Sequence, residues 1–327
     1  VILGILFFVS CKDKKQYYEE SGTVFHTLYT IKYEAPHILT DKIDAELQKF
    51  NLSLNPFNPN SIIAKVNNNE AVEVDEWFTE VFNKSMEVSR NSDGVFDITC
   101  APLVNLWGFG FNKKDSVTPA MIDSLKTFVG YRKVHLEGKK VVKDDPRLLL
   151  NCSAIAKGYS CDVIARLLEK EGVENYMILI GGEVVVKGVN QNGVCWRTGI
   201  NLPEDDPDGI KNNYDEIVQL CKKGAIATSG NYRNFYIKDG KKYAHTIDPR
   251  TGYPAEQSVL SATIVANDCM TADAYATAFM AMGLEKARQM TDSLPEIEYY
   301  VIYADENGKH QIEYSKGMLQ YLPKRKQ

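Results

Sequence analysis

The fold is decided by two adjoining stretches, Ala154-Ile-Ala-Lys-Gly-Tyr-Ser-Cys-Asp-Val-Ile-Ala-Arg-Leu-Leu-Glu-Lys170 and Tyr176-Met-Ile-Leu-Ile-Gly-Gly-Glu183. The first places its apolar side chains on one face at helical spacing, which predicts an amphipathic helix. The second is a short apolar run that ends at two glycines, which is typical of a buried strand. Together they predict a helix packed against the strand that follows it.

Further patterns extend in both directions from this pair. Helical spacing recurs at 40–50, 76–90 and 273–282, and strand patterns occur at 23–33, 148–150, 183–189, 195–201, 217–221, 243–247, 260–266 and 299–303. The order lacks the regular alternation that gives a doubly wound parallel sheet. We therefore expect an α+β fold with mixed sheets and packed helices, without internal repeats.

Composition and missing motifs exclude several classes of protein. The chain has 327 residues, of which 44% are hydrophobic, so it is long enough to bury a substantial core. Its net charge of -5 argues against a nucleic-acid partner, which would need a clustered basic face. The dinucleotide fingerprint, Walker loop, zincin motif and serine-hydrolase elbow are all absent.

The N-terminus has the pattern of an export signal. Residues 1–10 are apolar and are followed by Cys11, and a mature membrane span would need roughly 20 apolar residues. Phe8-Val-Ser-Cys11 resembles a bacterial lipobox, which predicts lipidation of Cys11; an uncleaved anchor or a chance cysteine is the alternative. The expected division is a signal and lipoprotein segment at 1–11, a polar spacer at 12–21 and one domain at 22–327.

Such an anchor would place the protein in the bacterial cell envelope, at the periplasmic face of the inner membrane. Six further cysteines show no zinc-type spacing, and we interpret them as mostly buried apolar residues. Export would permit a disulfide, but the sequence leaves its pairing open.

Asp273 and Thr277 are the first candidates for chemistry. They lie four residues apart at the start of an apolar helix, so a carboxylate and a hydroxyl share one face. Oxygen ligands of this kind suit Mg²⁺. The alternative is that Asp273 only complements the helix dipole and Thr277 packs.

Two other segments carry candidate polar groups. The small-residue turn from Asn151 into the helix would expose backbone N–H groups to an anion, with Lys157 adding positive charge, although a simple helix cap with Lys157 in solvent remains open. His245 ends a strand before an Asp-Pro turn, where it could move a proton or serve as a structural histidine.

Seven motifs in this order resemble the FAD:protein FMN transferases, also called the ApbE family. They are Phe-Asp-Ile-Thr (96–99), Pro-Leu-Val-Asn-Leu-Trp-Gly-Phe-Gly (102–110), Ala-Lys-Gly-Tyr (156–159), Gly-Gly-Glu (181–183), Thr-Ser-Gly-Asn-Tyr (228–232), His-Thr-Ile-Asp-Pro-Arg-Thr-Gly (245–252) and Ala-Asp-Ala-Tyr-Ala-Thr-Ala (272–278). The resemblance runs from Gly22 to about Met318.

The resemblance implies an ApbE-like fold with FAD in a cleft and Mg²⁺ on the FAD pyrophosphate. A Ser or Thr hydroxyl of an acceptor protein would attack, and AMP would leave. Asp273, Thr277 and the backbone carbonyl of Ala154 would be metal ligands. His245 and Asp273 would be catalytic, with His245 assisting deprotonation of the acceptor hydroxyl.

The implied FAD contacts are Phe25, Asn55, Val95, Phe96, Asp97, Asn151, Lys157 and Ile247. Phe25 and Asn55 stand where the family more often has Met and an aromatic residue, and Asn151 replaces a common Asp. The implied acceptors carry a Ser/Thr flavinylation motif, as in flavin-bearing subunits of membrane redox complexes. Two alternatives stay open, an FAD pyrophosphatase that yields FMN and AMP and a non-catalytic FAD-binding lipoprotein.

Overall fold

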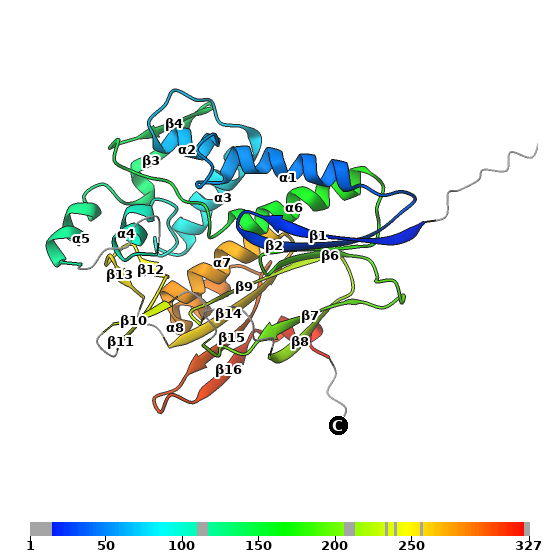
Figure 1. Cartoon of the computed structure of the whole chain (residues 1–327). Helices are drawn as coiled ribbons and strands as arrows, with labels where there is room; N and C mark the ends of the chain where they lie inside the picture. The colour runs from blue at the N-terminus through cyan, green and yellow to red at the C-terminus, as the bar shows by residue number, and fades with distance from the viewer. Residues whose placement is uncertain are drawn as a thin grey trace, which may run out of the picture.

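A single antiparallel sheet of eight strands forms the centre of the molecule (Figure 1). The computed structural model describes residues 15–109, 117–205, 213–232, 235–238, 241–255 and 258–323. In sheet order the strands are β1 (Gln16–Val24), β2 (Thr27–Ala35), β5 (Tyr176–Ile180), β6 (Glu183–Lys187), β9 (Gly224–Gly230), β14 (Val259–Ala266), β15 (Glu298–Ala304) and β16 (His310–Tyr314). All seven neighbouring pairs are antiparallel.

Helices cover one face of this sheet. They are α1 (Thr40–Leu54), α2 (Ile62–Asn67), α3 (Glu76–Asn91), α4 (Ala101–Leu106), α5 (Pro119–Lys126), α6 (Ala156–Lys170), α7 (Cys269–Met282) and α8 (Leu284–Thr291). Helix α6 packs on β5 and β6, α7 packs on β9 and β14, and the two helices pack on each other (Figure 1). The expected α+β class with packed helices is confirmed.

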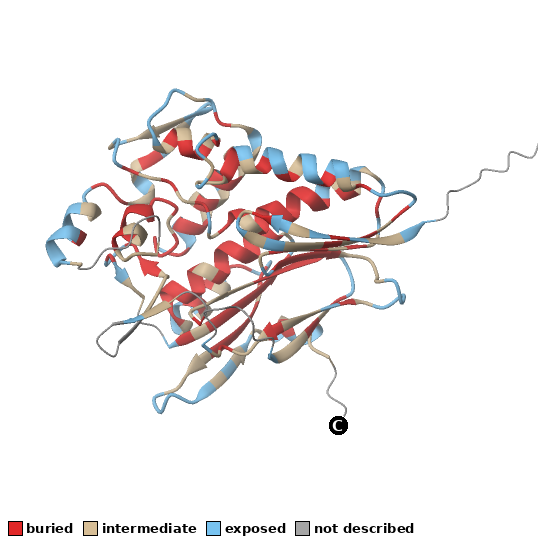
Figure 2. Cartoon of the chain, in the orientation of Figure 1, coloured by how far each residue is buried: buried red, intermediate tan, exposed pale blue. Residues whose placement is uncertain are grey.

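Helix α7 lies in the core of the molecule (Figure 2). Every one of its residues is buried except Thr277, which is partly exposed. This explains why the sequence of α7 is apolar all round rather than amphipathic. Its start is fixed by Asp268, whose carboxylate accepts a hydrogen bond from the N–H of Thr271 at 2.8 Å.

Smaller elements complete the fold. They are the strand pairs β3 (Val134–Glu137) with β4 (Lys140–Lys143), β7 (Trp196–Asn201) with β8 (Tyr214–Leu220), β10 (Phe235–Lys238) with β11 (Lys241–Ala244) and β12 (Ile247–Asp248) with β13 (Tyr253–Pro254), and the 3₁₀ turns η1 (Tyr131–Lys133) and η2 (Lys316–Gln320). The β7–β8 pair packs on the sheet face opposite the helices, through Trp196 and Val218. A disulfide between Cys195 and Cys221 joins the two strands and settles the pairing that the sequence left open.

The strand expected at 23–33 is in fact a hairpin. Phe25 and His26 have positive φ values of 51° and 61°, as in the tight turns that match the twist of a hairpin. The chain therefore reverses between β1 and β2. Because β1 starts at Gln16, the ordered fold also includes residues that we expected to be a polar spacer. Cys11 and the rest of 1–14 lie outside the described residues.

Two further expectations differ from the structure. Residues 148–150 form no strand, and the pattern at 243–247 is interrupted because β11 ends at Ala244 and β12 begins at Ile247. The segment containing Thr228 and Ser229, which contains a glycine motif, belongs to β9 in the middle of the sheet. Among the helices in the described part of the chain, none combines the length and apolar character needed to cross a membrane.

Candidate functional site

A cavity of about 460 Å³ opens where the N-terminal half of α6, the helix α7 and the end of β9 meet the β11–β12 segment. Its walls bring together ten of the predicted site residues. These are Val95, Phe96, Asp97, Asn151, Ala154, Lys157, His245, Ile247, Asp273 and Thr277. Segments that are far apart in the sequence therefore converge on one cavity, which is the arrangement expected of a ligand site.

Phe25 and Asn55 are not among the lining residues. Phe25 packs on Phe50, with 5.0 Å between the ring centroids. Asn55 caps α1, and its amide donates a hydrogen bond to Asn51 at 2.7 Å. The aromatic residue that does line the cavity from this segment is Phe57, two positions further along the chain.

The crossing of α6 over α7 positions Asp273. Gly158 is the third residue of α6, so its N–H has no partner within the helix, and it donates a hydrogen bond to Asp273 Oδ2 at 2.9 Å. A Cβ atom at Gly158 would stand 2.2 Å from the carbonyl oxygen of Cys269, so only glycine allows this approach. Asp273 is 2% exposed and is thus a buried carboxylate with a fixed direction.

Asp162 holds the start of α7 against α6. Its two carboxylate oxygens accept hydrogen bonds from the N–H groups of Cys269 and Met270, at 2.9 and 2.8 Å. Burial raises the pKa of Asp162 to about 7, although these hydrogen bonds act in the opposite direction. The contact fixes the first turn of α7, one turn before Asp273.

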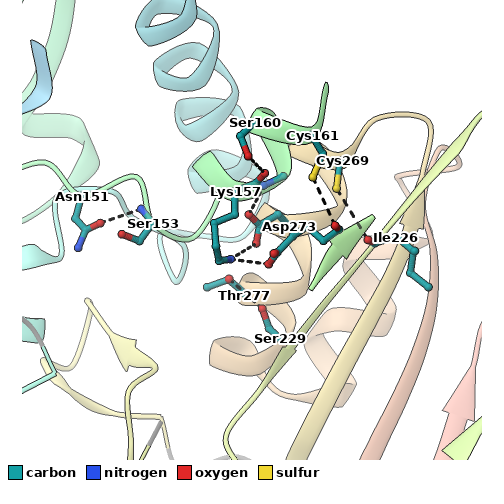
Figure 3. Close-up of polar contacts among 12 residues, drawn as sticks. Asn151, Ser153, Lys157, Ser160, Cys161, Ile226, Ser229, Cys269, Asp273 and Thr277 are labelled. Atoms are coloured by element: carbon teal, nitrogen blue, oxygen red, sulfur yellow. Dashed lines mark hydrogen bonds and ion pairs between the residues drawn. The ribbon is translucent and has the colours of Figure 1, made fainter. Parts of the chain in front are cut away.

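Lys157 points into the cavity rather than away from the protein (Figure 3). Its Nζ lies 2.5 Å from Glu183 Oε1 and 3.7 Å from Asp273 Oδ1. Burial lowers the pKa of Lys157, but the carboxylates of Asp273 and Glu183 outweigh it and raise this pKa above its ordinary value. Lys157 therefore places a positive charge in the cavity wall, and its side chain is engaged by carboxylates rather than extended freely into solvent.

The same wall has the oxygen atoms that a hard cation prefers. Thr277 follows Asp273 by one turn, and its hydroxyl lies 3.2 Å from the hydroxyl of Ser229 on β9. Within the described residues, His, Cys, Asp and Glu side chains form no group of three that could hold a metal ion. A cation at this wall would depend on one carboxylate together with hydroxyl and carbonyl oxygens, a set that suits Mg²⁺ rather than zinc.

Asp97 lines the cavity but is committed to the backbone. Its Oδ1 accepts a hydrogen bond from the N–H of Thr99 and its Oδ2 accepts one from the N–H of Tyr131, both at 2.7 Å. Burial raises its pKa against the effect of these bonds. Asp97 thus holds the wall segment in shape, next to Val95 and Phe96, which are almost fully buried.

Asn151 shapes the entry to α6. Its side-chain oxygen accepts a hydrogen bond from the N–H of Ser153 at 2.8 Å, and its own N–H donates to Ile98 O at 2.7 Å. These bonds tie the turn before α6 to the segment that carries Asp97. The asparagine therefore supports the cavity wall without adding a further carboxylate to those of Asp97, Glu183 and Asp273.

His245 lies in the break between β11 and β12 and also lines the cavity. Its ring stands edge-on to Phe109, with 6.4 Å between the centroids. Stacked aromatic rings continue outward from Phe109 through Tyr236 and Tyr243 to Trp107, at centroid distances of 5.2, 5.3 and 5.7 Å. The imidazole of His245 and the ring of Phe109 thus line the cavity, and the rings behind Phe109 support it from outside.

Several residues of the site could not be assigned from the sequence. Glu183, Ser229, Phe57 and Phe109 line the cavity and received no individual role. Glu183, Ser229 and Phe109 belong to motifs that carry the family resemblance, which gave them no role of their own. Glu183 and Ser229 reach the site because β6 and β9 pack against α7, a contact that no local pattern in the sequence predicts.

The chain is similar to known proteins over most of its length. Residues 25–301 match the model of the ApbE family. The chain is 35% identical over 303 residues to the FAD:protein FMN transferase of Vibrio cholerae, with 89% of each chain covered. It is 32% identical over 312 residues to the protein of the same name from Escherichia coli K12, covering 89% of this chain and 88% of that protein.

Solved structures show the same fold. The flavin transferase ApbE from Vibrio cholerae superposes with a TM-score of 0.84 at 34% identity, covering 94% of this chain and all of that one. The apo form of the flavinyl transferase ApbE from Pseudomonas stutzeri gives a TM-score of 0.83 at 26% identity, covering 94% and 97%. Family model, sequence identity and fold agree, and the chain belongs to the ApbE family.

Proposed function

We propose that this chain is an FAD:protein FMN transferase that uses Mg²⁺ and modifies a Ser or Thr hydroxyl of an acceptor protein. The transferase activity follows from family membership and from relatives that carry this name. The observation that supports the proposed chemistry is one cavity that combines a buried carboxylate, a hydroxyl one helical turn away, a charged lysine and a histidine.

The proposed reaction transfers the FMN half of FAD, through its phosphorus atom, to the acceptor and releases the AMP half. The acceptor oxygen forms a new bond to the FMN phosphorus, and the bond from that phosphorus to the AMP phosphate oxygen breaks. The acceptor loses its proton to His245, and AMP leaves with the bridging oxygen. The phosphate oxygens gain negative charge during this exchange, so nearby positive charge stabilises the transition state.

The chain's own residues divide this work. Lys157 supplies a fixed positive charge in the cavity wall. Asp273, Thr277 and the carbonyl of Ala154 would hold Mg²⁺, which offsets phosphate charge when bound. The Gly158 N–H aligns the Asp273 carboxylate for this role, while the ring of Phe109 beside His245 offers apolar surface to a flat ring.

Export to the cell envelope forms part of the proposal. The disulfide between Cys195 and Cys221 supports this, because disulfides form and persist in oxidising compartments such as the periplasm. We propose that a lipid on Cys11 anchors the chain to the inner membrane on that side. The acceptors would then be exported proteins, such as flavin-carrying subunits of membrane redox complexes.

An FAD pyrophosphatase remains the second candidate, because the same cavity would serve if water replaced the acceptor hydroxyl. A non-catalytic FAD carrier is less well supported, since it would need no fixed carboxylate and hydroxyl pair on α7. The two enzymes differ in their products. Only the transferase adds mass to a protein, whereas both release AMP.

Mass spectrometry of a reaction with FAD, Mg²⁺ and an acceptor carrying a Ser/Thr flavinylation motif tests the proposal. We expect the acceptor to gain one FMN group with one AMP released, and both products to disappear with a chelator. The Thr277→Val variant keeps the shape of Thr277 without its hydroxyl, and it should need more Mg²⁺. Free FMN with an unmodified acceptor would favour the pyrophosphatase instead.

A further inference from the structure

Glu183 is a buried carboxylate in the cavity for which the reaction above has no use. It is the first residue of β6, it follows the turn at Gly181 and Gly182, and it is only 3% exposed. Its Oε2 atom has no hydrogen-bond partner among the described residues. Burying a carboxylate oxygen without a hydrogen-bond partner costs stability, and a residue that carries this cost beside a ligand site is a candidate for a role in that site.

The turn before β6 is shaped to admit this side chain. Gly181 has a φ of +67°, and a Cβ atom there would stand 3.1 Å from Lys157 Cδ and 3.2 Å from Glu183 Oε2. Glycine at this corner leaves the space through which the lysine side chain reaches the carboxylate. The Lys157–Glu183 contact is therefore built into the β5–β6 hairpin and not a chance surface pair.

The distances show that one ammonium is shared unequally between two carboxylates. Lys157 Nζ is 2.5 Å from Glu183 but 3.7 Å from Asp273 Oδ1, beyond hydrogen-bond distance. The other oxygen of Asp273 is occupied by the Gly158 N–H. Oδ1 is thus the atom of Asp273 that is left for a cation, and Lys157 is the group that would compete for it.

We propose that Glu183 is a positioning residue that binds the Lys157 ammonium and keeps it off Asp273 Oδ1, leaving that oxygen open to a divalent cation. This inference rests on the proposed function, because it assumes the cation site at Asp273. Lys157 held in this way still faces the cavity, where it meets the phosphates of the substrate.

The size of the effect follows from Coulomb's law. If Glu183 releases Lys157, the ammonium closes from 3.7 Å to an ordinary ion-pair contact with Asp273. At a contact distance of about 2.8 Å and an effective dielectric constant of about 20, the added attraction corresponds to about a tenfold loss of cation affinity. The cation must displace that ion pair before it binds.

Manganese binding to the chain without FAD measures this directly. Mn²⁺ substitutes for Mg²⁺ at oxygen sites, and the electron paramagnetic resonance signal of free Mn²⁺ reports the bound fraction without any turnover. The variants are Glu183→Gln, which removes the charge, and Glu183→Asp, which keeps the charge on a side chain one methylene shorter. The pair separates positioning of Lys157 from a general effect of negative charge.

Glu80→Gln is the matched control. Glu80 binds Arg166, another cation of α6, at 2.8 Å, and it does not line the cavity. Asp273→Asn marks the cation site itself. Circular dichroism and thermal unfolding of every variant exclude loss of fold as the cause of a change.

We expect both Glu183 variants to bind Mn²⁺ about tenfold more weakly and Glu80→Gln to match the wild type. The double variant Glu183→Gln with Lys157→Met should recover the affinity, because the competing ammonium is gone. If Glu183→Asp bound Mn²⁺ as tightly as the wild type, or if the double variant did not recover Mn²⁺ affinity, the positioning role would be overturned while the proposed function would stand. If the wild type binds no Mn²⁺ that Asp273→Asn abolishes, the proposed cation site fails and this inference fails with it.

Discussion

Replacing Gly158 by alanine should destabilise the protein, although the same change in an ordinary helix stabilises it. A Cβ atom at this position would stand 2.2 Å from the carbonyl oxygen of Cys269 and 2.7 Å from Asp273 Cβ. Both contacts are closer than atoms tolerate, so α6 and α7 must separate. The separation also stretches the 2.9 Å hydrogen bond from the Gly158 N–H to Asp273.

The expected magnitude combines three contributions. Alanine gains about 1 kcal/mol over glycine in a helix interior. Overpacking of a close helix crossing loses about 2 kcal/mol, and a strained hydrogen bond to a charged group loses about 2 kcal/mol more. The net result is a decrease of about 3 kcal/mol in the free energy of unfolding.

Urea unfolding followed by circular dichroism measures this change, and Gly224→Ala is the control. A Cβ atom at Gly224 meets its nearest neighbour, Leu220 Cδ2, at an ordinary 3.7 Å, so that variant should be as stable as the wild type. A Gly158→Ala variant as stable as the wild type would refute the reasoning. It would mean that α6 and α7 can move apart enough to admit a methyl group without loss of stability.

Three other predictions concern charge, covalent linkage and proton transfer. Burial raises the pKa of Asp162 to about 7 in the folded state, so the folded protein keeps a proton that the unfolded chain loses near pH 4. This group therefore lowers the free energy of unfolding as pH rises from about 4 to about 7. The free energy of unfolding of Asp162→Asn, measured across this range, should fall less steeply with pH than that of the wild type. The disulfide spans 26 residues, so reduction should lower the free energy of unfolding by about 3 kcal/mol, and equal thermal unfolding with and without dithiothreitol would contradict this. His245→Gln should retain FAD binding, measured by flavin fluorescence, but transfer FMN at least about a hundredfold more slowly, whereas an unchanged rate would remove His245 from proton transfer.

The elements that the sequence predicted well are those whose pattern is local. β5 begins and ends at the residues expected, because its apolar run is bounded by Asn175 and by Gly181. The start of α7 was placed four residues too late, since apolar spacing alone marks the helix interior. Asp268, the residue that caps α7, was the local signal for its true start.

Other features depend on contacts between distant parts of the chain. The hairpin turn at Phe25 and His26 has none of the glycine or asparagine residues that mark such turns, so the pairing of β1 with β2 selects it. The same applies to the disulfide, because only the β7–β8 register brings Cys195 to Cys221. No local pattern in the sequence distinguishes these two cysteines from Cys100, Cys152, Cys161 and Cys269.

The candidate site was predictable in its members more than in its geometry. The family resemblance pointed to ten residues that line one cavity, but it gave Glu183 no role. Its importance comes from burial and from its distance to Lys157, which are properties of the packed structure. Phe57 replaces Asn55 at the cavity because α1 runs on to Leu54 and leaves Asn55 as its cap.

Helix α7 serves the site and the core at once, and this restricts which substitutions the site can accept. The helix that carries Asp273 is also the middle of the core, and Thr277 is its only residue that is not buried. Substitutions that retune the site must therefore also satisfy core packing, which narrows the set of acceptable changes on this wall. If the chain modifies proteins as proposed, new acceptor preferences should arise at lining residues outside the core, such as Phe57, Phe109 and Thr246, which are at least partly exposed.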